Sequence, residues 1–349
     1  MNILFLTTHA YLPQRVGGSE SSTNDLCQLL LAKGDSVAVM ASLDLYDRIW
    51  LMNRIKAKFT KNLMPSDINI GYPVYRGWNL TKGLESVINE FQPDCVITQA
   101  GESIPIIQRL DQLNIKTFVY LRDVAFASHG GSYFKSENIK YIANSQFTAK
   151  KFKNTFDISS FVIPPSITSS NYKGKRTPKY VLFVCPFPEK GLEVALKVAE
   201  ANPDIPFLFL ESWKLSEINL QNLKTRLLKI PNITFKHSQK SMLPIYTETK
   251  ITLMPSQCEE AWGRVASESQ VNGIPVIASN IGGLPESVGK GGVLVPPNAE
   301  IAIWTEKLRQ LWDNDEVYNE YSQLALQHSK RPEIAPSHLV SVLKNYISY

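Results

Sequence analysis

Residues 251–278 read ITLMPSQCEEAWGRVASESQVNGIPVIA, and this stretch decides the fold. It opens with a short apolar run, Ile251–Met254, and closes with another, Val276–Ala278, and both runs are typical of buried strands. Between them a polar loop leads into a helical pattern that begins near Gly263, and Gly273 is expected to end that helix. A strand, a helix and a second strand in this order predict a parallel sheet that is covered by helices.

The same alternation extends from this stretch in both directions. Short apolar runs are bounded by turn residues, and most of them are followed by segments with helical periodicity. The further strands that we expect are 3–6, 37–40, 95–98, 117–121, 141–143 and 161–163, then 180–184, 207–210, 233–235 and 293–295. From residue 315 to the end the pattern is helical, with a break at Arg331-Pro332.

Two domains are the natural expectation for 349 residues, because a single core stops growing at roughly 250–300 residues. A polar stretch rich in proline and serine, 166–178, has no apolar periodicity and is interpreted as a linker. We therefore expect an α/β protein with two doubly wound, Rossmann-like domains, 1–165 and 179–330, which face each other across a cleft. The last helix, 331–349, is expected to pack on the first domain. Ligands of such folds bind outside the carboxyl ends of the strands.

Composition excludes several classes of protein. With 44% hydrophobic and 20% charged residues the chain is neither disordered nor fibrous, and a net charge of +5 is too small to predict a nucleic-acid partner. The four cysteines lie far apart, which argues against a zinc site or a disulfide framework and favours a reducing compartment. No apolar run is long enough to span a membrane, and the first eight residues resemble a strand rather than a signal peptide. We expect a cytoplasmic protein.

The loop after the first strand, 8–20, carries neither the dinucleotide fingerprint nor a P-loop, which disfavours hydride transfer. It does contain Gly17-Gly18 at the start of a helical pattern. Glycines let a phosphate approach the backbone, and a helix N-terminus offers free amides. An ordinary turn that needs positive φ, with Ser19 as the N-cap, explains the pair equally well. His9 in the same loop is either a further phosphate contact or an ordinary loop histidine.

Two glutamates give the strongest chemical pattern. Glu260 lies in the loop and Glu268 on the helix, and eight helical residues rise about 12 Å and turn about 80° past two full turns. Both carboxylates are therefore expected on one side, with the amides of the helix N-terminus between them. This arrangement suits a sugar–diphosphate–ribose ligand, since carboxylates accept hydrogen bonds from vicinal hydroxyls. Two solvated glutamates on an amphipathic helix are the alternative.

At this point the chain resembles the retaining GT-B glycosyltransferases of family 4, the glycogen-synthase-like class. The motifs that carry the resemblance are EAWGRVASE from Glu260 to Glu268, GIPV from Gly273 to Val276, and GGLPE from Gly282 to Glu286. The Gly17-Gly18 pair, YIANSQFT at 141–148 and the turn Glu189-Lys190-Gly191 also match, in order along the chain.

The resemblance implies a GT-B fold in which the second domain binds a nucleotide sugar and the first binds the acceptor. Glu260 would contact the hydroxyls of the donor sugar and Lys190 would neutralise the diphosphate, so that both are catalytic. The other donor-binding positions that it implies are Glu268 for the ribose hydroxyls, the backbone of Gly263, Arg264 and Val265, and the glycines Gly17 and Gly18. The sugar would pass with retention to a sugar or lipid-linked acceptor, with the leaving diphosphate helping to deprotonate it. No metal or other cofactor is expected, because fixed cations and helix dipoles can stabilise the departing charge.

Three positions depart from the family pattern. Residues 184–190 read VCPFPEK and lack the arginine that usually precedes the lysine, and Arg264 is either its replacement or an exposed helix arginine. Arg122 stands where many relatives have a histidine, and it either faces the cleft or forms an ion pair with Asp123 or another neighbour. Residues 99–102, QAGE, stand where relatives often show another histidine.

A basic amphipathic stretch, 48–64, carries five basic residues and no acid. One interpretation is a peripheral contact with the inner face of an anionic membrane, close to a lipid-linked acceptor. We favour the other, in which the apolar stripe of a helix packs on the sheet of the first domain.

Two rival functions share the fold. The missing arginine and histidine are compatible with a nucleotide-sugar-binding partner subunit that has little activity of its own. A GT-B epimerase would act on the sugar nucleotide, but it does not share the glutamate pair.

Overall fold

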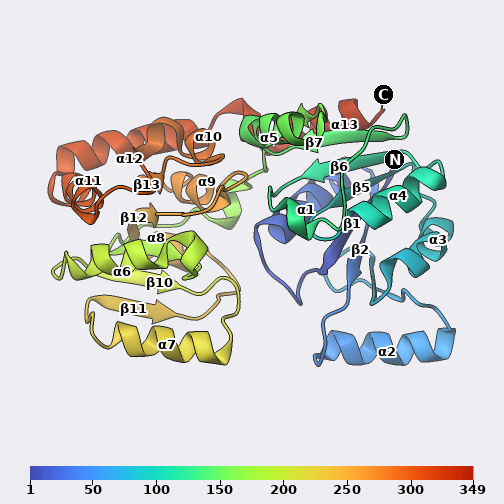
Figure 1. Ribbon diagram of the computed structural model, residues 1–349, viewed down its shortest axis with the longest axis horizontal. Coiled ribbons are helices and arrows are strands. Elements are labelled where there is room, and N and C mark those ends of the chain that lie inside the picture. The colour runs from blue at the N-terminus through green and yellow to red at the C-terminus, as the bar shows by residue number, and fades with distance from the viewer. Residues whose placement is uncertain (349) are drawn as a thin grey trace. The chain divides into compact units, whose positions relative to one another are not determined.

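The computed structural model describes residues 1–348, and the chain divides into two compact units. The first unit comprises Met1–Ser166 together with the C-terminal segment that begins at Pro336, and the second comprises Ile167–Ala335. Each unit contains one mostly parallel sheet with helices on both faces (Figure 1). The expected α/β fold with two Rossmann-like sheets is confirmed.

The first unit is built on an eight-stranded sheet in the order β3-β4-β2-β1-β5-β6-β7-β8. Its strands are β1 Asn2–Ala10, β2 Ser36–Ser42, β3 Ser66–Asp67, β4 Val74–Gly77, β5 Cys95–Gln99, β6 Thr117–Leu121, β7 Ile139–Ala143 and β8 Phe161–Val162. All neighbouring strands are parallel except β3 and β4. Residues 3–6 of β1 are fully buried, which is the physical reason for an uninterrupted apolar run at the start of the chain.

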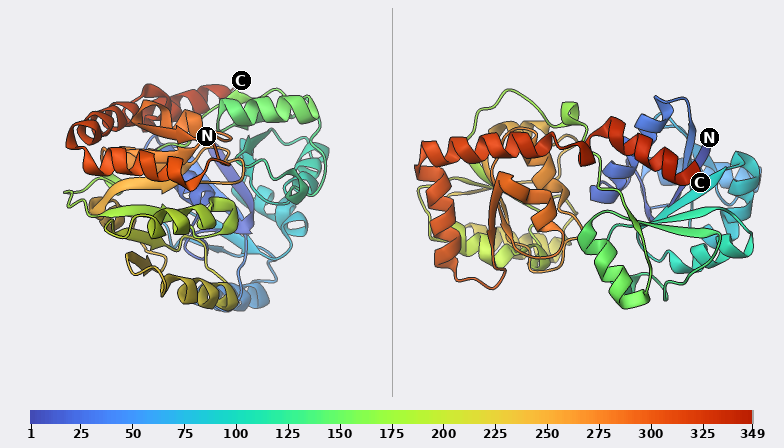
Figure 2. Two further views of the ribbon diagram at one scale, coloured as in Figure 1. Left: turned by 60° about the vertical axis from the view of Figure 1, so that its left-hand side comes forward. Right: turned by 90° about the horizontal axis from the view of Figure 1, so that it is seen from above.

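Two layers of helices cover this sheet. The helices of the unit are α1 Gly18–Leu31, α2 Arg48–Thr60, α3 Leu80–Phe91, α4 Ile104–Gln112, α5 Gln146–Phe156 and α13 Pro336–Ser348. α1 and α13 contribute to one core cluster, through Leu26 and Leu343 among others, whereas α3 and α4 contribute to a second through Leu84 and Leu110. α13 ends beside the first strand, where Lys344 and the N-terminal amine both pair with Asp35 (Figure 2).

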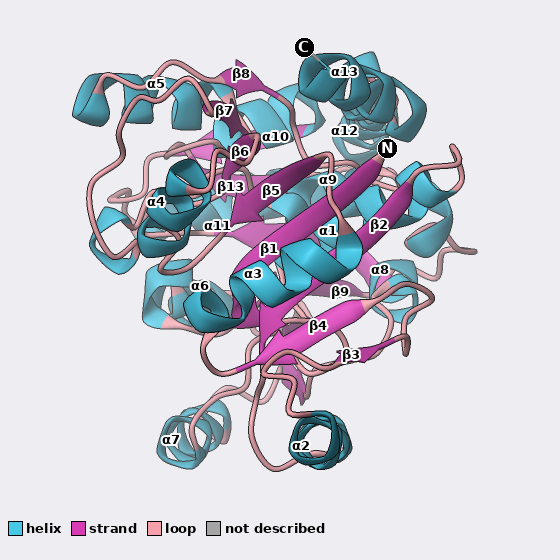
Figure 3. Cartoon of the chain, turned by 90° about the vertical axis from the view of Figure 1, so that its right-hand side faces the viewer, coloured by secondary structure: helices cyan, strands magenta, loops and turns pink. Residues whose placement is uncertain are grey.

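α2 belongs to neither layer. Asn53 is its one buried residue, while Met52 and Phe59 on the predicted apolar stripe are exposed. The helix lies apart from the sheet, joined to it by loops (Figures 1 and 3). The favoured interpretation, that this stripe packs on the sheet, is therefore wrong. Both faces of the sheet are already covered by the other helices, which leaves no apolar surface for α2 to cover.

The second unit has a six-stranded parallel sheet in the order β11-β10-β9-β12-β13-β14. Its strands are β9 Tyr180–Val184, β10 Phe207–Leu210, β11 Ile233–Lys236, β12 Thr249–Met254, β13 Val276–Ser279 and β14 Gly292–Val295. Its helices are α6 Leu192–Glu200, α7 Glu217–Leu227, α8 Leu243–Glu248, α9 Arg264–Gln270, α10 Leu284–Val288, α11 Ile301–Asp313 and α12 Asp315–Ser329. The strand order reverses between β9 and β12, and a reversal of this kind is where open α/β sheets bind ligands.

The stretch interpreted as a linker, 166–178, lies almost wholly in the second unit. Ile167 and Tyr172 are buried there in one core cluster with Leu182 and Leu208 of the sheet. These two apolar side chains hold the segment on the sheet, so it does not behave as a free spacer. The boundary between the units falls after Ser166, and the segment that returns to the first unit begins at Pro336 rather than at residue 331.

None of the helices described between residues 1 and 348 has both the length and the apolar character that a membrane span requires.

Candidate functional site

The loops that follow β9 and β12 bring Lys190 and Glu260 together. Nζ of Lys190 lies 2.6 Å from Oε1 of Glu260, and the Ser256 hydroxyl donates a second hydrogen bond of 2.9 Å to the same oxygen. The two charged side chains are 18% and 15% exposed, so both remain partly accessible. Because β9 and β12 are neighbours at the reversal of strand order, the two residues predicted as catalytic lie where open α/β sheets generally bind ligands.

Glycines allow these loops to close. Gly191 has a φ of +84°, and a Cβ there would lie 1.9 Å from the carbonyl oxygen of Pro255. Gly282 has a φ of +61°, and a Cβ there would lie 2.4 Å from the carbonyl oxygen of Glu260. The N–H of Gly283 donates to the same carbonyl at 2.6 Å. Glycine at these positions is therefore required by the backbone approach that positions Glu260.

The electrostatics of the pair keep Lys190 charged. Burial lowers the pKa of the Lys190 amine, but the charge and the hydrogen bond of Glu260 outweigh that effect, so the pKa lies above its ordinary value. The ammonium also lies 5.3 Å from the ring centroid of Trp213. Burial raises the pKa of the nearby Cys185 thiol to about 12, which makes it a poor nucleophile. What the arrangement offers is a fixed cation beside a hydrogen-bond-accepting carboxylate.

Glu268 has a different environment from the one expected. Glu260 lies in the loop before α9 and Glu268 inside that helix, as the sequence predicted, but Glu268 belongs to a buried network. Its Oε1 accepts a hydrogen bond from Nε of Arg264 at 2.7 Å, and its Oε2 accepts one from the Tyr246 hydroxyl at 2.8 Å. Burial, followed by the charge of Glu268, holds the pKa of the Tyr246 phenol well above its usual range. Glu268 is buried, so the alternative that it is a solvated glutamate is wrong.

Arg264 is buried as well, so it is not an exposed helix arginine. Besides Glu268 it reaches the Tyr172 hydroxyl, to which Nη2 donates at 2.7 Å. Gly263 is the N-cap of α9, with a φ of +93°, and a Cβ there would lie 2.4 Å from a methyl carbon of Leu284. The first N–H groups of this helix, including that of Val265, have no acceptor in a preceding helical turn.

In the first unit the Gly17-Gly18 pair lies at the start of α1. Gly17 is the N-cap of α1, with an extended φ of −159°, and Gly18 is the first helical residue. Neither glycine has a positive φ, and Ser19 lies inside the helix rather than at its cap, so the conformational explanation for the pair is wrong. Burial, followed by the charge of Arg15, lowers the pKa of His9. At neutral pH this histidine is uncharged.

Arg122 packs against the first turn of α1. Its Nη1 donates to the carbonyl oxygen of Ser19 and to the Thr23 hydroxyl, both at 2.9 Å, and its guanidinium lies 4.0 Å from the ring centroid of Tyr120. The side chain therefore links the end of β6 to the start of the helix that carries the glycine pair.

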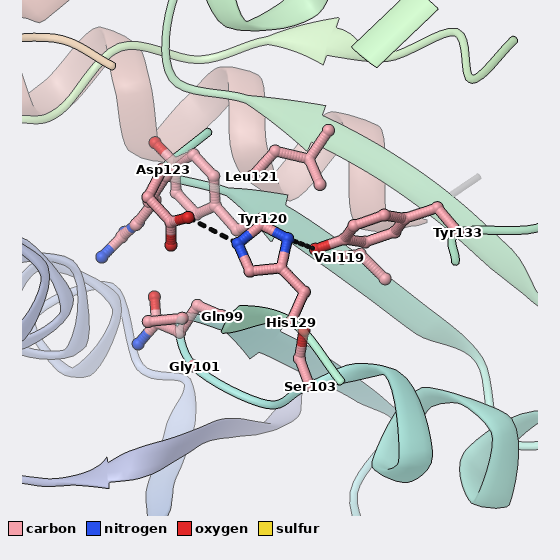
Figure 4. A pocket seen from close by; sticks show the side chains of 11 residues that line it. Gln99, Gly101, Ser103, Val119, Tyr120, Leu121, Asp123, His129 and Tyr133 are labelled. Carbon is pink, nitrogen blue, oxygen red and sulfur yellow. Dashed lines mark hydrogen bonds and ion pairs between the residues drawn. The ribbon is translucent and has the colours of Figure 1, made fainter. Parts of the chain in front are cut away.

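A small pocket lies at the carboxyl ends of β5 and β6 (Figure 4). Inside it Nε2 of His129 lies 2.5 Å from Oδ1 of Asp123, and Nδ1 lies 3.0 Å from the Tyr133 hydroxyl. Burial raises the pKa of the Asp123 carboxyl, but the hydrogen bond and charge of His129 outweigh it, so the pKa lies below its ordinary value. Asp123 is thus an ionised carboxylate held by a buried histidine.

Sequence reasoning did not single out His129. The residue lies in a loop without periodicity, six positions after its partner, and only its residue type could have drawn attention to it. Among residues 1–348, no group of three or more His, Cys, Asp or Glu side chains is placed to hold a metal ion.

Comparison with known proteins gives a sequence match to the second unit. Residues 168–328 match the family described as Glycosyl transferases group 1. The D-inositol 3-phosphate glycosyltransferase of Corynebacterium efficiens is 36% identical over 93 residues, which cover 26% of this chain and 22% of that protein. Spore coat protein SA of Bacillus subtilis is 28% identical over 152 residues, which cover 40% of each chain. The chain therefore matches less than half the length of these curated relatives.

The fold match covers the whole chain. The structure of HepE from Anabaena in complex with UDP-glucose aligns with a TM-score of 0.77 at 15% identity, over 100% of this chain and 99% of the other. Sucrose-phosphate synthase from Thermosynechococcus elongatus aligns with a TM-score of 0.77 at 12% identity, over 99% and 98%. At these identities the likeness establishes the fold, which is that of GT-B glycosyltransferase structures.

Proposed function

We propose that this chain is a glycosyltransferase that moves a sugar from a nucleotide-diphosphate sugar to an acceptor hydroxyl and retains the anomeric configuration. The observation that carries the proposal is the Lys190–Glu260 pair at the reversal of strand order in the second unit. The match of residues 168–328 to glycosyltransferases of group 1 supports it. The retaining, family 4 assignment rests on the motif from Glu260 to Glu268.

Lys190 and the start of α9 would stabilise the leaving group. As the bond between the anomeric carbon and the diphosphate oxygen breaks, negative charge accumulates on the diphosphate. The Lys190 ammonium and the N–H groups at Gly263, Arg264 and Val265 can meet that charge. The proton of the acceptor hydroxyl passes to the departing diphosphate as the new glycosidic bond forms. Because these fixed groups can stabilise the charge of the leaving diphosphate, we include no metal in the proposed reaction.

The two glutamates would have separate tasks. Glu260, held by Lys190 and Ser256, would accept hydrogen bonds from hydroxyls of the donor sugar and so orient it. Glu268 would hold the ribose hydroxyls. An ionised carboxylate has about four lone-pair sites, so the internal bonds from Arg264 and Tyr246 leave acceptor capacity and fix its direction.

The first unit would recognise the acceptor, a sugar or a lipid-linked sugar. Arg122 is the candidate there. Gly17 and Gly18 would let a phosphate approach the backbone of α1, and His9 is the candidate for a further phosphate contact. We place the enzyme in the cytoplasm because its four cysteines are free thiols, which suits a reducing compartment.

The experiment is a donor screen with the purified chain, in which UDP-, GDP-, ADP- and dTDP-sugars are followed by release of the nucleoside diphosphate. The Glu260→Gln variant should lose turnover, whereas Lys236→Ala, which removes a lysine from an exposed ion pair of the same unit, should keep it. Proton NMR of the product should show the anomeric configuration of the donor. An inverted product would contradict retention, and turnover by Glu260→Gln equal to that of the unmodified chain would contradict the site.

One observation favours a second function, a nucleotide-sugar-binding subunit with little activity. Arg264, the candidate replacement for the missing diphosphate arginine, is engaged by Glu268 and Tyr172. Saturable binding of a donor without release of nucleoside diphosphate, under conditions where an added partner protein restores release, would favour this second function.

A further inference from the structure

α2 and the turns beside it form a surface that is both apolar and basic. Tyr46, Phe59 and Leu63 are 85%, 83% and 61% exposed. We call the following set the α2 surface: the apolar side chains Tyr46, Leu51, Met52, Ile55, Phe59 and Leu63 and the basic side chains Arg48, Arg54, Lys56, Lys58 and Lys61. No other helix of the first unit exposes so many large apolar side chains within the described residues.

The helical arrangement sorts these side chains into bands. At about 100° per residue, the apolar residues 51, 52, 55 and 59 fall within an arc of about 100°. Arg54 and Lys58 flank that arc on one side and Lys56 flanks it on the other, while the buried Asn53 lies opposite. Arg48, in the first turn, also falls within this arc, and Met52 and Lys56 lie at its edge beside the unit. The stripe of Leu51, Ile55 and Phe59 is exposed.

The side of α2 that faces the rest of the unit is not a tight core contact. An open hollow on this side is lined by Arg48, Ile49, Met52, Asn53 and Lys56 of the helix and by Pro13, Asp67 and Asn69. The helix is held mainly by polar contacts, such as the hydrogen bond of 2.9 Å from Lys56 to the carbonyl oxygen of Ser66. The stripe is exposed because the chain places α2 away from the sheet (Figures 1 and 3).

Two acids beside α2, Asp47 and Asp67, are bonded to groups other than its basic side chains. Asp47 caps α2 by accepting from the N–H of Trp50 at 2.6 Å and also accepts from Gln14. Asp67 pairs with the buried Arg76 at 2.7 Å. The five basic side chains outnumber the exposed acids Asp44 and Asp47 beside them, so the surface carries a net positive charge.

We propose that the α2 surface binds an anionic lipid bilayer, with the apolar stripe in the interface and the basic band on the headgroups. Charge and shape together favour this occupant. A second copy of the same face would oppose cations to cations, and a nucleic acid would leave the apolar stripe in water. A helix that carries an apolar stripe between lysines and arginines lies in the plane of an anionic membrane interface. This contact goes beyond the proposed transfer reaction and does not depend on it.

The test is co-sedimentation of the full chain with vesicles of phosphatidylcholine alone and of phosphatidylcholine with 30% phosphatidylglycerol. The unmodified chain should bind the anionic vesicles and be released by about 0.5 M salt, because the Debye length then falls to a few ångströms. Arg54→Ser/Lys58→Ser/Lys61→Ser should weaken binding about 100-fold, from roughly fivefold per basic residue at the surface. Phe59→Ser/Leu63→Ser should weaken it by about tenfold or more.

The chain offers a matched control. Ile218→Ser/Leu228→Ser removes two apolar side chains that are 74% and 86% exposed in and after α7 of the second unit, and it should leave vesicle binding unchanged. Thermal melting checks that each variant is folded. Equal binding to both kinds of vesicle, binding that survives Phe59→Ser/Leu63→Ser, or a dimer in solution that this double variant dissociates would each overturn the proposal. Turnover of a donor with a water-soluble acceptor should be the same in all variants, so a failure of membrane binding leaves the transfer reaction standing.

Discussion

Replacing Lys190 by methionine keeps most of the side-chain length but removes the charge that faces Glu260. At an effective dielectric constant of about 20, two charges 2.6 Å apart attract by about 6 kcal/mol, and the burial of both groups offsets part of this. We expect the variant to lose about 3 kcal/mol of stability, the low end for a broken buried pair, because both groups keep some exposure. For a unit of this size the melting temperature should fall by about 6–12 °C.

The catalytic effect should be larger than the structural one. Loss of a group that stabilises the leaving diphosphate should lower kcat about 100- to 1,000-fold, with a smaller change in the KM for the donor. Ser256→Ala is the matched control, because it removes the other hydrogen bond to the same Glu260 oxygen and keeps the cation. That variant should lose about 1 kcal/mol of stability and little of kcat. Lys190→Arg should recover part of the activity.

The assay is release of nucleoside diphosphate at a temperature at least 15 °C below the lowest melting point of the set. If Lys190→Met stays folded and keeps kcat within about threefold of the unmodified chain, the lysine has only a structural role. The same conclusion follows if kcat in the two variants simply tracks their stability.

Three further outcomes follow from the site and its surroundings. Burial lowers the pKa of His328 to about 4, so the unfolded chain takes up a proton that the folded chain refuses, and stability should fall by about 1–2 kcal/mol as the pH drops from about 6.5 towards 4. In urea titrations across that range His328→Gln should flatten the fall, and an unchanged slope in that variant would contradict the assignment. Trp213 is 39% exposed beside Lys190, so nucleoside diphosphates should quench its fluorescence, and an equal quench in Trp213→Phe would refute its place at the site. Glu268→Gln should raise the Kd for nucleoside diphosphates about tenfold without affecting inorganic pyrophosphate, and an equal loss for both ligands in calorimetry would argue against a ribose contact.

Much of the fold was accessible from the sequence, because parallel strands that are buried on both faces appear as continuous apolar runs. The run at residues 251–254 and its partner at 276–278 became β12 and β13, with the helix between them beginning one residue after Gly263. The proximity of Lys190 and Glu260 was also predictable, since both follow strands that the topology places side by side.

The errors have a common physical origin. The segment 48–64 has the same amphipathic pattern whether its apolar stripe faces a core or solvent. The stripe is left exposed because other helices already cover both faces of the sheet. Ile167 and Tyr172 are isolated apolar residues in a polar stretch, so periodicity did not reveal that they pack on the second sheet.

The missed partners of the site depend on long-range contacts. Tyr246 reaches Glu268 across 22 positions of the chain, and Tyr172 reaches Arg264 across 92. His129 meets Asp123 through a loop conformation that no local pattern encodes. Sequence identifies residue types that can do chemistry, but the pairing of such residues across the fold requires coordinates.

The most direct test of the central claim is a crystal structure of the full chain with a bound nucleoside diphosphate. The diphosphate should contact Nζ of Lys190 and the first N–H groups of α9, with the ribose hydroxyls on Glu268. A diphosphate bound elsewhere, with the Lys190–Glu260 pair intact and untouched by the ligand, would contradict it.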